Sequence, residues 1–275
     1  MSITEPGIYD LPELEYHADP IPGGSFSSTM AKQILKSPAH LRHYLDSPRV
    51  EKKEFDFGHI VHGGVLGVGL DVEVLDFDDY RTKAAREARD RAYAAGRVPI
   101  IERDYEPARD AIEAVKAHPI AWPLFAGDGL PERSAFAVDP SAGLWLRGRF
   151  DWITPSGILV DLKTTTDGAP FAFDSDARKL RYYLQAAFYM HVYQLATGDE
   201  PRGFMFVTVE KSAPHLVDAY QVGRAGLELG AMQTRRAIDT YKRCLDSGEW
   251  PGRPAVINEL NPPLWAITEE EDLSL

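Results

Sequence analysis

Alternating apolar and polar residues predict a series of strands beginning near the middle of the chain. Residues 132–139 (ERSAFAVD), 144–153 (LWLRGRFDWI) and 157–163 (GILVDLK) show this pattern or a short apolar run. Residues 203–211 (GFMFVTVEK) and 216–222 (LVDAYQV) predict two further strands. The strand-rich part of the chain is therefore expected to begin near residue 132.

Apolar residues at helical spacing predict helices before, between and after these strands. Ser27 or Ser28 is suited to cap a short helix, and Pro38 separates that helix from a second short one. Further helices are expected within 54–67, 80–96, 105–119, 176–197 and 224–247, with Gly96, Pro119, Gly198 and Gly248 as stop signals. This order of helices and strands predicts an α/β domain with a mixed sheet.

The composition is typical of an ordinary soluble globular protein. The chain has 275 residues, of which 44% are hydrophobic, and this suffices to bury one sizeable core. No apolar run has the length of a transmembrane helix, and the N-terminus lacks the basic start and apolar stretch of a secretion signal. We therefore expect a cytoplasmic protein that makes no membrane contact.

The chain shows no internal repeat and no clear domain boundary, so we expect one domain over 1–275. Its parts are expected to be an irregular arm, a mainly helical region, a strand-containing core and a C-terminal tail, over 1–24, 25–125, 130–250 and 251–275, respectively.

Charge and cysteine content restrict the function. A formal net charge of -12 argues against general nucleic-acid binding, because neutralising phosphates requires clustered Lys and Arg. An acidic protein that handles DNA must gather its positive residues around one site, where divalent metals can add positive charge. Cys244 is the one cysteine, which excludes an internal disulfide and a four-cysteine zinc or iron–sulfur site.

Charged residues interrupt two neighbouring expected strands at positions that share a face. Alternation places Arg147, Arg149 and Asp151 on one face of the first strand, and Asp161 and Lys163 on one face of the second. A three-residue hairpin loop between these strands, with its glycine in the left-handed conformation, places Asp151 directly opposite Asp161.

Two facing carboxylates destabilise a sheet unless their repulsion is offset. A divalent cation is the obvious candidate, and oxygen ligands suit Mg²⁺ or Mn²⁺. Lys163 projects toward the same centre, where it can orient an attacking water and stabilise negative charge, while the metal lowers the pKa of that water. These residue types predict phosphodiester hydrolysis. The alternative is a surface ion-pair cluster in which Arg147 and Arg149 neutralise the two aspartates.

The central segment RGRFDWI…GILVDLKTTT resembles the core of the PD-(D/E)XK nucleases, in the branch that contains the nuclease domain of exodeoxyribonuclease VIII and its phage relatives. Similar motifs are LPELEYHADP, GSFSSTMAKQILKSPAHLRHYL, FGHIVHGGVLG, PERSAFAVD and YLQAAFYMHVYQLATG, so that the likeness extends from about Leu11 to Trp265. The resemblance implies a restriction-endonuclease-like α/β core, with a mixed central sheet flanked by helices and an N-terminal helical region.

The resemblance also implies the residues of a metal-dependent nuclease site. His62, Asp151, Asp161 and the main-chain carbonyl of Leu162 would hold Mg²⁺ or Mn²⁺, with two ions present during catalysis. Lys163 would be the catalytic lysine.

The resemblance further implies that one face of the helix expected over 176–197 looks toward this centre. Gln185 would orient Lys163 or hold a phosphate, and Tyr189 lies on the same face one turn later. DNA contacts or support of the metal ligands are expected from Glu132, Arg147, Arg149, Thr164 and Tyr189.

The function implied by the resemblance is resection of linear double-stranded DNA by a 5′-to-3′ exonuclease, which leaves 3′ tails for a single-strand annealing partner in recombination. Related exonucleases form rings around DNA, so a homo-oligomeric ring is expected, in a bacterium or a phage-infected cell. The motifs do not encode cleavage polarity, and a branch- or flap-cutting endonuclease remains an alternative. A non-catalytic DNA-end-binding module is a further alternative, although His62, Asp151, Asp161 and Lys163 are all present.

Overall fold

A computed structural model describes residues 2–47, 57–69 and 72–262 of the chain. The strands are β1 Gly7–Tyr9, β2 Phe26–Ser27, β3 Val72–Leu75, β4 Val98–Ile101, β5 Leu130–Val138, β6 Trp145–Ile153, β7 Ile158–Thr165, β8 Gly203–Glu210 and β9 Val217–Gln221. The helices are α1 Glu13–His17, α2 Ser28–Ile34, α3 Pro38–Asp46, α4 Phe57–Leu66, α5 Lys83–Ala94, α6 Glu102–Ala117, α7 Trp122–Phe125, α8 Pro170–Lys179, α9 Tyr182–Thr197 and α10 Arg224–Ser247.

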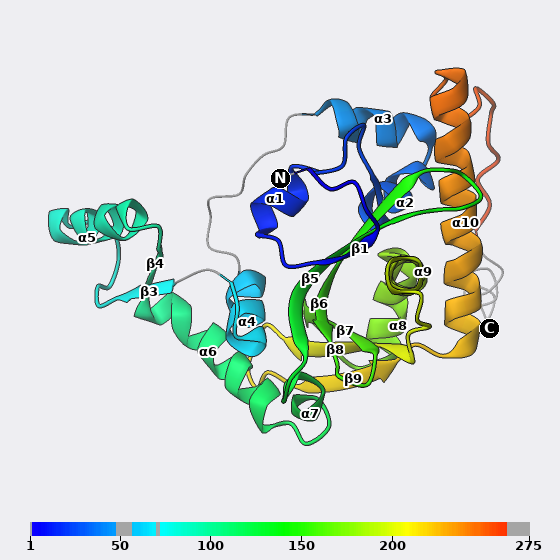
Figure 1. The fold of residues 1–275 in the computed structure, drawn as a ribbon. Helices are drawn as coiled ribbons and strands as arrows, with labels where there is room; N and C mark the ends of the chain where they lie inside the picture. Colours follow the sequence, from blue (N-terminus) through cyan, green and yellow to red (C-terminus); the bar gives the residue numbers. More distant parts are fainter. Residues whose placement is uncertain (1, 48–56, 70–71, 263–275) are drawn as a thin grey trace, which may run out of the picture.

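The main sheet is mixed, as the sequence predicts. Its seven strands follow the order β1-β5-β6-β7-β8-β9, with β2 paired to β6 beside this path. The β7–β8 and β2–β6 pairs are parallel, and the other pairs are antiparallel. Strands β3 and β4 form a separate parallel pair, which projects with α5 beyond α6 (Figure 1).

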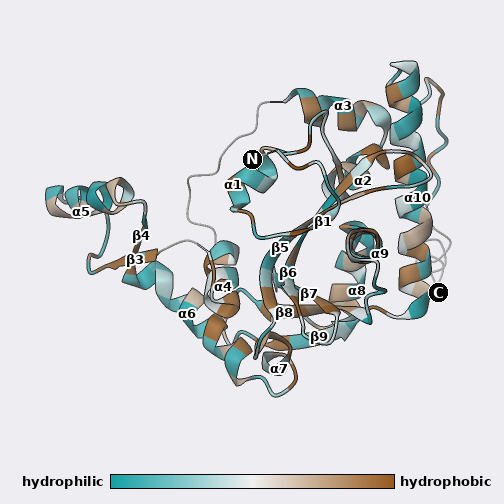
Figure 2. Cartoon of the chain, in the orientation of Figure 1, coloured by the Kyte–Doolittle hydropathy of each residue, from teal (hydrophilic) through white to brown (hydrophobic). Residues whose placement is uncertain are grey.

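Helices cover both faces of the main sheet (Figure 1). Residues of α2, α9 and α10 form one core with Leu159 of β7, whereas α4 and α6 form a second core with Val160 and Leu162 of the same strand. Alternate residues of a strand point to opposite faces, so β7 contributes to both cores. Figure 2 shows hydrophobic colour along the sheet and a largely hydrophilic α5. None of the helices within the described residues combines the length and apolarity needed to cross a membrane.

Local sequence signals account for the helix boundaries near the N-terminus. The Ser27 hydroxyl accepts a 3.3 Å hydrogen bond from the Met30 N–H and caps α2. The Ser37 hydroxyl caps α3 in the same way, and Pro38 occupies the first position of α3. The break predicted at Pro38 is therefore present.

Two expectations differ from the structure, and a third omits short strands. The helix expected over 176–197 is divided, because Arg181 adopts a left-handed backbone conformation (φ 55°) between α8 and α9. The arm expected to be irregular over 1–24 contains β1 and α1, and β1 gains its order by pairing with β5. The region expected to be mainly helical over 25–125 is mainly helical, and it also contains the short strands β2, β3 and β4.

The edge of β6 divides into two paired stretches with an open stretch between them. Near its start, Leu146 and Arg147 pair with β2, and near its end, Trp152 and Ile153 pair with β7. Residues 148–151 therefore face a fork between β2 and β7. Helix α2 continues directly from β2, so it borders the same fork.

Candidate active site

Asp151 and Glu132 lie where regular strand pairing is interrupted. Strands β5 and β6 pair in register on either side of these two residues, but Glu132 has a left-handed backbone conformation (φ 51°). Phe150 and Trp152 would share a face in a regular strand, yet they pack in opposite cores. The local distortion of both strands thus coincides with the two carboxylates.

The expected hairpin register between β6 and β7 is present close to the turn. Gly157 has φ 82°, and Trp152 and Ile153 pair with Val160 and Leu159. Beyond this point, the Asp151 Oδ2 atom accepts a 2.8 Å hydrogen bond from the Leu162 N–H. A side chain therefore replaces backbone pairing where the strands begin to separate.

His62 approaches the same point from α4, which packs against Val160 and Leu162 of β7. Its Nε2 atom lies 2.7 Å from the Leu162 carbonyl oxygen, and its Nδ1 atom lies 3.6 Å from Asp151 Oδ2. Ligand atoms of His62, Glu132 and Asp151 all lie within 4.8 Å of one another. One imidazole nitrogen, two carboxylates and a nearby carbonyl form a donor set that fits Mn²⁺ or Mg²⁺.

Asp161 and Lys163 form a second, adjoining group. Asp161 is only 2% exposed and forms an ion pair with Lys163. Its Oδ1 atom accepts a 2.6 Å hydrogen bond from Gln185 Nε2 of α9. The structure therefore brings Gln185 to Asp161, and Lys163 also lies 5.2 Å from the ring centre of Tyr182.

The electrostatics of the two groups are linked. Burial, together with the negative charge of Asp161, raises the pKa of Asp151 to about 7. Burial alone would lower the pKa of Lys163, but Asp161 and Asp151 outweigh it, so that this pKa is raised. The protein thus holds Lys163 as a cation, while the positive charge around Asp151 is insufficient to keep that carboxyl at its ordinary pKa.

The arginines do not neutralise the two aspartates, contrary to the ion-pair alternative. Arg147 pairs with Asp19 at 2.7 Å. Arg149 pairs with Glu132 at 2.7 Å and donates 2.9 Å hydrogen bonds to the Leu11 carbonyl oxygen and Ser134 Oγ. Arg147 therefore binds the N-terminal segment, and Arg149 binds both that segment and β5. The ion pair with Arg149 also orients the Glu132 carboxylate.

Tyr189 and Thr164, which are expected to contact DNA or support the metal ligands, both contact neighbouring parts of the sheet. Tyr189 packs edge-on against Phe150, with 5.4 Å between ring centres, and a Cβ atom on Gly148 would lie 3.3 Å from its ring. Thr164 pairs with Val209 of β8. The ring of Tyr189 therefore packs against β6.

Lys32 of α2 was not singled out from the sequence. Its Nζ atom donates a 3.0 Å hydrogen bond to Gln185 Oε1 and lies 5.4 Å from the ring centre of Tyr182. The only local signal is a lysine between Ala31 and Ile34, both of which are buried. Such a pattern does not reveal that the lysine meets a residue more than 150 positions away.

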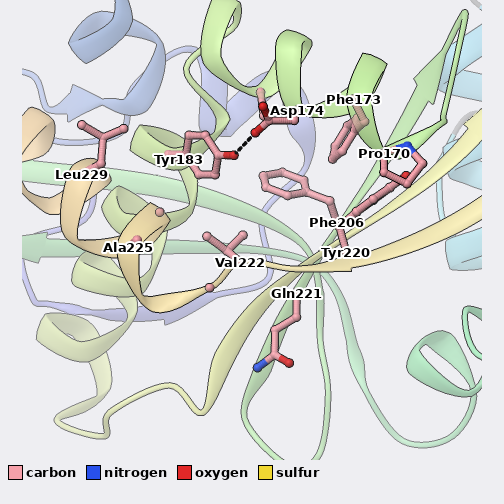
Figure 3. A pocket seen from close by; sticks show the side chains of 13 residues that line it. Pro170, Phe173, Asp174, Tyr183, Phe206, Tyr220, Gln221, Val222, Ala225 and Leu229 are labelled. Carbon is pink, nitrogen blue, oxygen red and sulfur yellow. Dashed lines mark hydrogen bonds between the residues drawn. The ribbon is translucent and has the colours of Figure 1, made fainter.

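An apolar pocket of about 460 Å³ adjoins the site but does not contain it. Aromatic residues from α8, α9, β8 and β9 line it, and Tyr183 donates a 2.6 Å hydrogen bond to Asp174 at its wall (Figure 3). Phe206 lines the pocket and also lies 5.8 Å from Lys163 Nζ, measured to its ring centre. Phe206 is therefore shared between the pocket and the surroundings of Lys163. Glu132, Asp151 and Asp161 do not line the pocket.

Comparisons with solved structures indicate the fold. The crystal structure named "Putative exonuclease" from Eubacterium rectale superposes with a TM-score of 0.61 at 13% identity, covering 95% of this chain and 98% of that chain. At that identity, the likeness concerns the fold alone. The "phage related exonuclease" from Haemophilus somnus 129PT gives a TM-score of 0.36 at 9% identity, over 82% of this chain and 96% of that chain. No curated protein sequence matches the chain.

Family membership follows from the sequence itself. The family described as "PDDEXK-like domain of unknown function (DUF3799)" matches residues 27–260, which include every candidate site residue named above. The match agrees with the mixed sheet and flanking helices, and it confirms the PD-(D/E)XK nuclease fold that the sequence predicts. The chain therefore belongs to this family of PDDEXK-like domains.

Proposed function

We propose that the chain is a metal-dependent deoxyribonuclease that hydrolyses DNA phosphodiester bonds. The observation that carries the proposal is the convergence of His62, Glu132 and Asp151 within 4.8 Å, beside the ion pair of Asp161 and Lys163. Membership in a PDDEXK-like family supports it. Together, these groups combine metal-ligand chemistry with a cation that can face a phosphate.

Each residue has a role that its surroundings support. His62, Asp151, Asp161 and the Leu162 carbonyl would hold Mg²⁺ or Mn²⁺. The proximity of Glu132 to His62 and Asp151 supports a ligand role for Glu132 as well, and Asp161 would join the ligands from the adjoining ion pair with Lys163. A bound divalent ion polarises a phosphoryl oxygen and lowers the pKa of the attacking water.

The remaining chemistry belongs to two side chains of the second group. Lys163 would orient the attacking water and stabilise the negative charge that develops on the phosphate. Gln185 would keep Asp161 oriented through the 2.6 Å hydrogen bond to its Oδ1 atom.

The finer proposal is a 5′-to-3′ exonuclease that resects linear double-stranded DNA for recombination by single-strand annealing. It rests on the motif resemblance to the exodeoxyribonuclease VIII branch, which extends over most of the chain. We further propose that the chain acts as one nuclease domain inside the cell, that it works with an annealing protein, and that several copies surround the DNA.

The test is degradation of end-labelled linear duplex DNA beside a closed circle of equal length, with Mg²⁺, Mn²⁺ or a chelator. The wild-type chain is compared with Asp161→Asn. We expect metal-dependent loss of the linear DNA alone, with no loss in the variant, and the end whose label disappears first gives the polarity.

Other outcomes distinguish the alternatives. Cutting of the circle, or of branched DNA alone, would identify an endonuclease. Survival of all substrates at every metal concentration, combined with retained binding to DNA ends, would contradict the proposal in favour of an end-binding module.

A further inference from the structure

Lys32 borders the fork in which the carboxylates lie, yet the proposed chemistry does not use it. Strand β2 pairs with Leu146 and Arg147 of β6, and α2 continues directly from β2. Ala31 and Ile34 of α2 are buried in the core, and Lys32 between them is partly buried. Packing of α2 therefore fixes the position from which Lys32 reaches Gln185.

The surroundings of the Lys32 ammonium are unusual for a partly buried cation. It donates a 3.0 Å hydrogen bond to Gln185 Oε1, and no carboxylate of the described residues forms an ion pair with it. Burial and the nearby charge of Lys163 lower the pKa of Lys32 to about 8. Withdrawing a cation from water without a carboxylate partner costs stability, which a functional contact would explain.

The Gln185 amide lies between the Lys32 ammonium and the Asp161 carboxylate, and hydrogen-bonding chemistry allows it one orientation there. An ammonium group can only donate hydrogen bonds, and an ionised carboxylate can only accept them. Gln185 is 7% exposed and lies between Lys32 and Asp161, with its Oε1 atom toward Lys32 and its Nε2 atom toward Asp161. The hydrogen bond from Lys32 therefore keeps Gln185 Oε1 on the side away from Asp161, so that Nε2 is the atom that faces Asp161.

The oriented Gln185 amide in turn restricts the orientation of the Asp161 carboxylate. Gln185 engages the Oδ1 atom at 2.6 Å, while the Oδ2 atom contacts Lys163. Loss of Lys32 would leave a buried amide oxygen without its donor, and the amide would then be free to turn away from Asp161. The carboxylate would lose the hydrogen bond that fixes its plane.

We propose that Lys32 is a positioning residue of the active site, which acts through the Gln185 amide to hold the Asp161 carboxylate in one orientation. This inference rests on the proposed nuclease function of the same site. It assigns Lys32 no contact with DNA, and this distinguishes it from a phosphate-binding role for the same side chain.

A double-mutant cycle tests the inference. The variants are Lys32→Met, Gln185→Met and the double variant, with cleavage of linear duplex DNA as the readout. Lys36→Met, an exposed lysine just beyond the same helix, is the matched control. We expect kcat to fall by roughly 10–100-fold in Lys32→Met, the range typical of residues that support metal ligands, with KM nearly unchanged.

The cycle should show strong coupling. Once Gln185 has been replaced, loss of Lys32 should have no further effect, because Lys32 acts through that amide. Lys32→Arg supplies another group that can only donate, and it should restore much of kcat. Additive losses, with a raised KM and a weaker dependence of DNA binding on salt, would overturn the inference and identify a phosphate contact. Full activity of Lys32→Met would also overturn it.

A second readout separates this inference from the proposed function. If the wild-type chain cleaves no DNA, the function fails, and the Mn²⁺-induced rise in Tm decides the role of Lys32 in the same variants. Positioning predicts an equally reduced rise in Lys32→Met, Gln185→Met and the double variant. A rise in Lys32→Met equal to that of the wild type would contradict positioning even then.

Discussion

Asp139 and the neighbouring pair Asp151 and Asp161 have opposite electrostatic surroundings. Asp139, at the turn after β5, is 1% exposed. Both of its oxygens lie 3.0 Å from Arg235 Nη1, and it accepts a 2.8 Å hydrogen bond from the Ala142 N–H and contacts His191 Nε2 at 3.2 Å. Burial alone would raise the pKa of Asp139, but these partners outweigh it, so that the pKa is lowered.

Asp151 and Asp161 lack comparable compensation. Lys163 pairs with Asp161, and Asp151 receives the Leu162 N–H and a half-buried histidine, but neither carboxylate meets an arginine. The pKa of Asp151 is accordingly raised to about 7 by burial and by Asp161. The charge of Asp139 is therefore balanced within the chain, and we propose that an added cation balances the charge of Asp151 and Asp161.

The largest expected effect concerns activity. Asp161→Asn should lower kcat by more than about 100-fold, the upper end for residues that merely support a metal ligand. Asp139→Asn should leave kcat of the folded protein unchanged, since Asp139 binds the turn to α9 and α10. Steady-state cleavage at saturating DNA, with matched amounts of folded protein, measures kcat for both variants. Equal losses of kcat in the two variants would contradict a difference between the two sites.

The free energy of unfolding should instead fall in Asp139→Asn, the variant in which kcat is expected to be unchanged. Asp139→Asn leaves Arg235 without its buried carboxylate, so we expect the free energy of unfolding to fall by about 3 kcal/mol. The remaining contact of Arg235 with Asp239 places this at the lower end of the range for broken buried pairs. Urea unfolding in the presence of a chelator measures the change, and a loss below about 0.5 kcal/mol would mean that the pair of Asp139 and Arg235 is no different from an exposed ion pair.

Asp151→Asn should instead stabilise the metal-free protein at pH 8, by about 2 kcal/mol. A carboxyl with a raised folded-state pKa binds its proton more tightly when folded, so its ionisation reduces stability as pH rises from about 4 to about 7. The advantage of the variant over the wild type should therefore grow through that interval and remain constant above it. Unfolding curves at several pH values test this sign, and an advantage that shrinks as pH rises would refute it.

The smallest effect concerns backbone conformation. Arg181 and Glu132 both adopt left-handed φ angles, 55° and 51°, which glycine tolerates without steric cost. Arg181→Gly should raise the free energy of unfolding by about 0.5 kcal/mol and leave cleavage intact. Glu132→Gly relieves the same conformation but removes a candidate ligand, so it should reduce cleavage. Equal cleavage in the two variants would exclude Glu132 from the site.

Local sequence determines much of this architecture. Period-two alternation and a turn glycine predict the β6–β7 hairpin, and the pairs next to Gly157 have the expected register. Helix α10 spans the predicted residues 224–247 because its signals are helical spacing and a terminal glycine. The segments that carry His62 and Gln185 are helical as expected, and the structure brings both residues to the hairpin.

The remaining features depend on contacts between distant segments. Strand β1 has three residues and is ordered by pairing with β5, which its own sequence cannot indicate. The partners of Arg147 and Arg149 are Asp19 and Glu132 from other elements, which alternation along one strand cannot identify. The interruption at Glu132 and Asp151 likewise arises between strands, and it explains why Glu132 faces His62.

Equilibrium binding of Mn²⁺ by calorimetry tests the central claim most directly, because it asks whether a cation balances the charge of Asp151 and Asp161. The wild-type chain is compared at pH 8 with Asp151→Asn and Asp139→Asn. We predict saturable binding to the wild type and to Asp139→Asn, and its loss in Asp151→Asn. Absence of binding to the wild type, or unchanged binding to Asp151→Asn, would contradict the account.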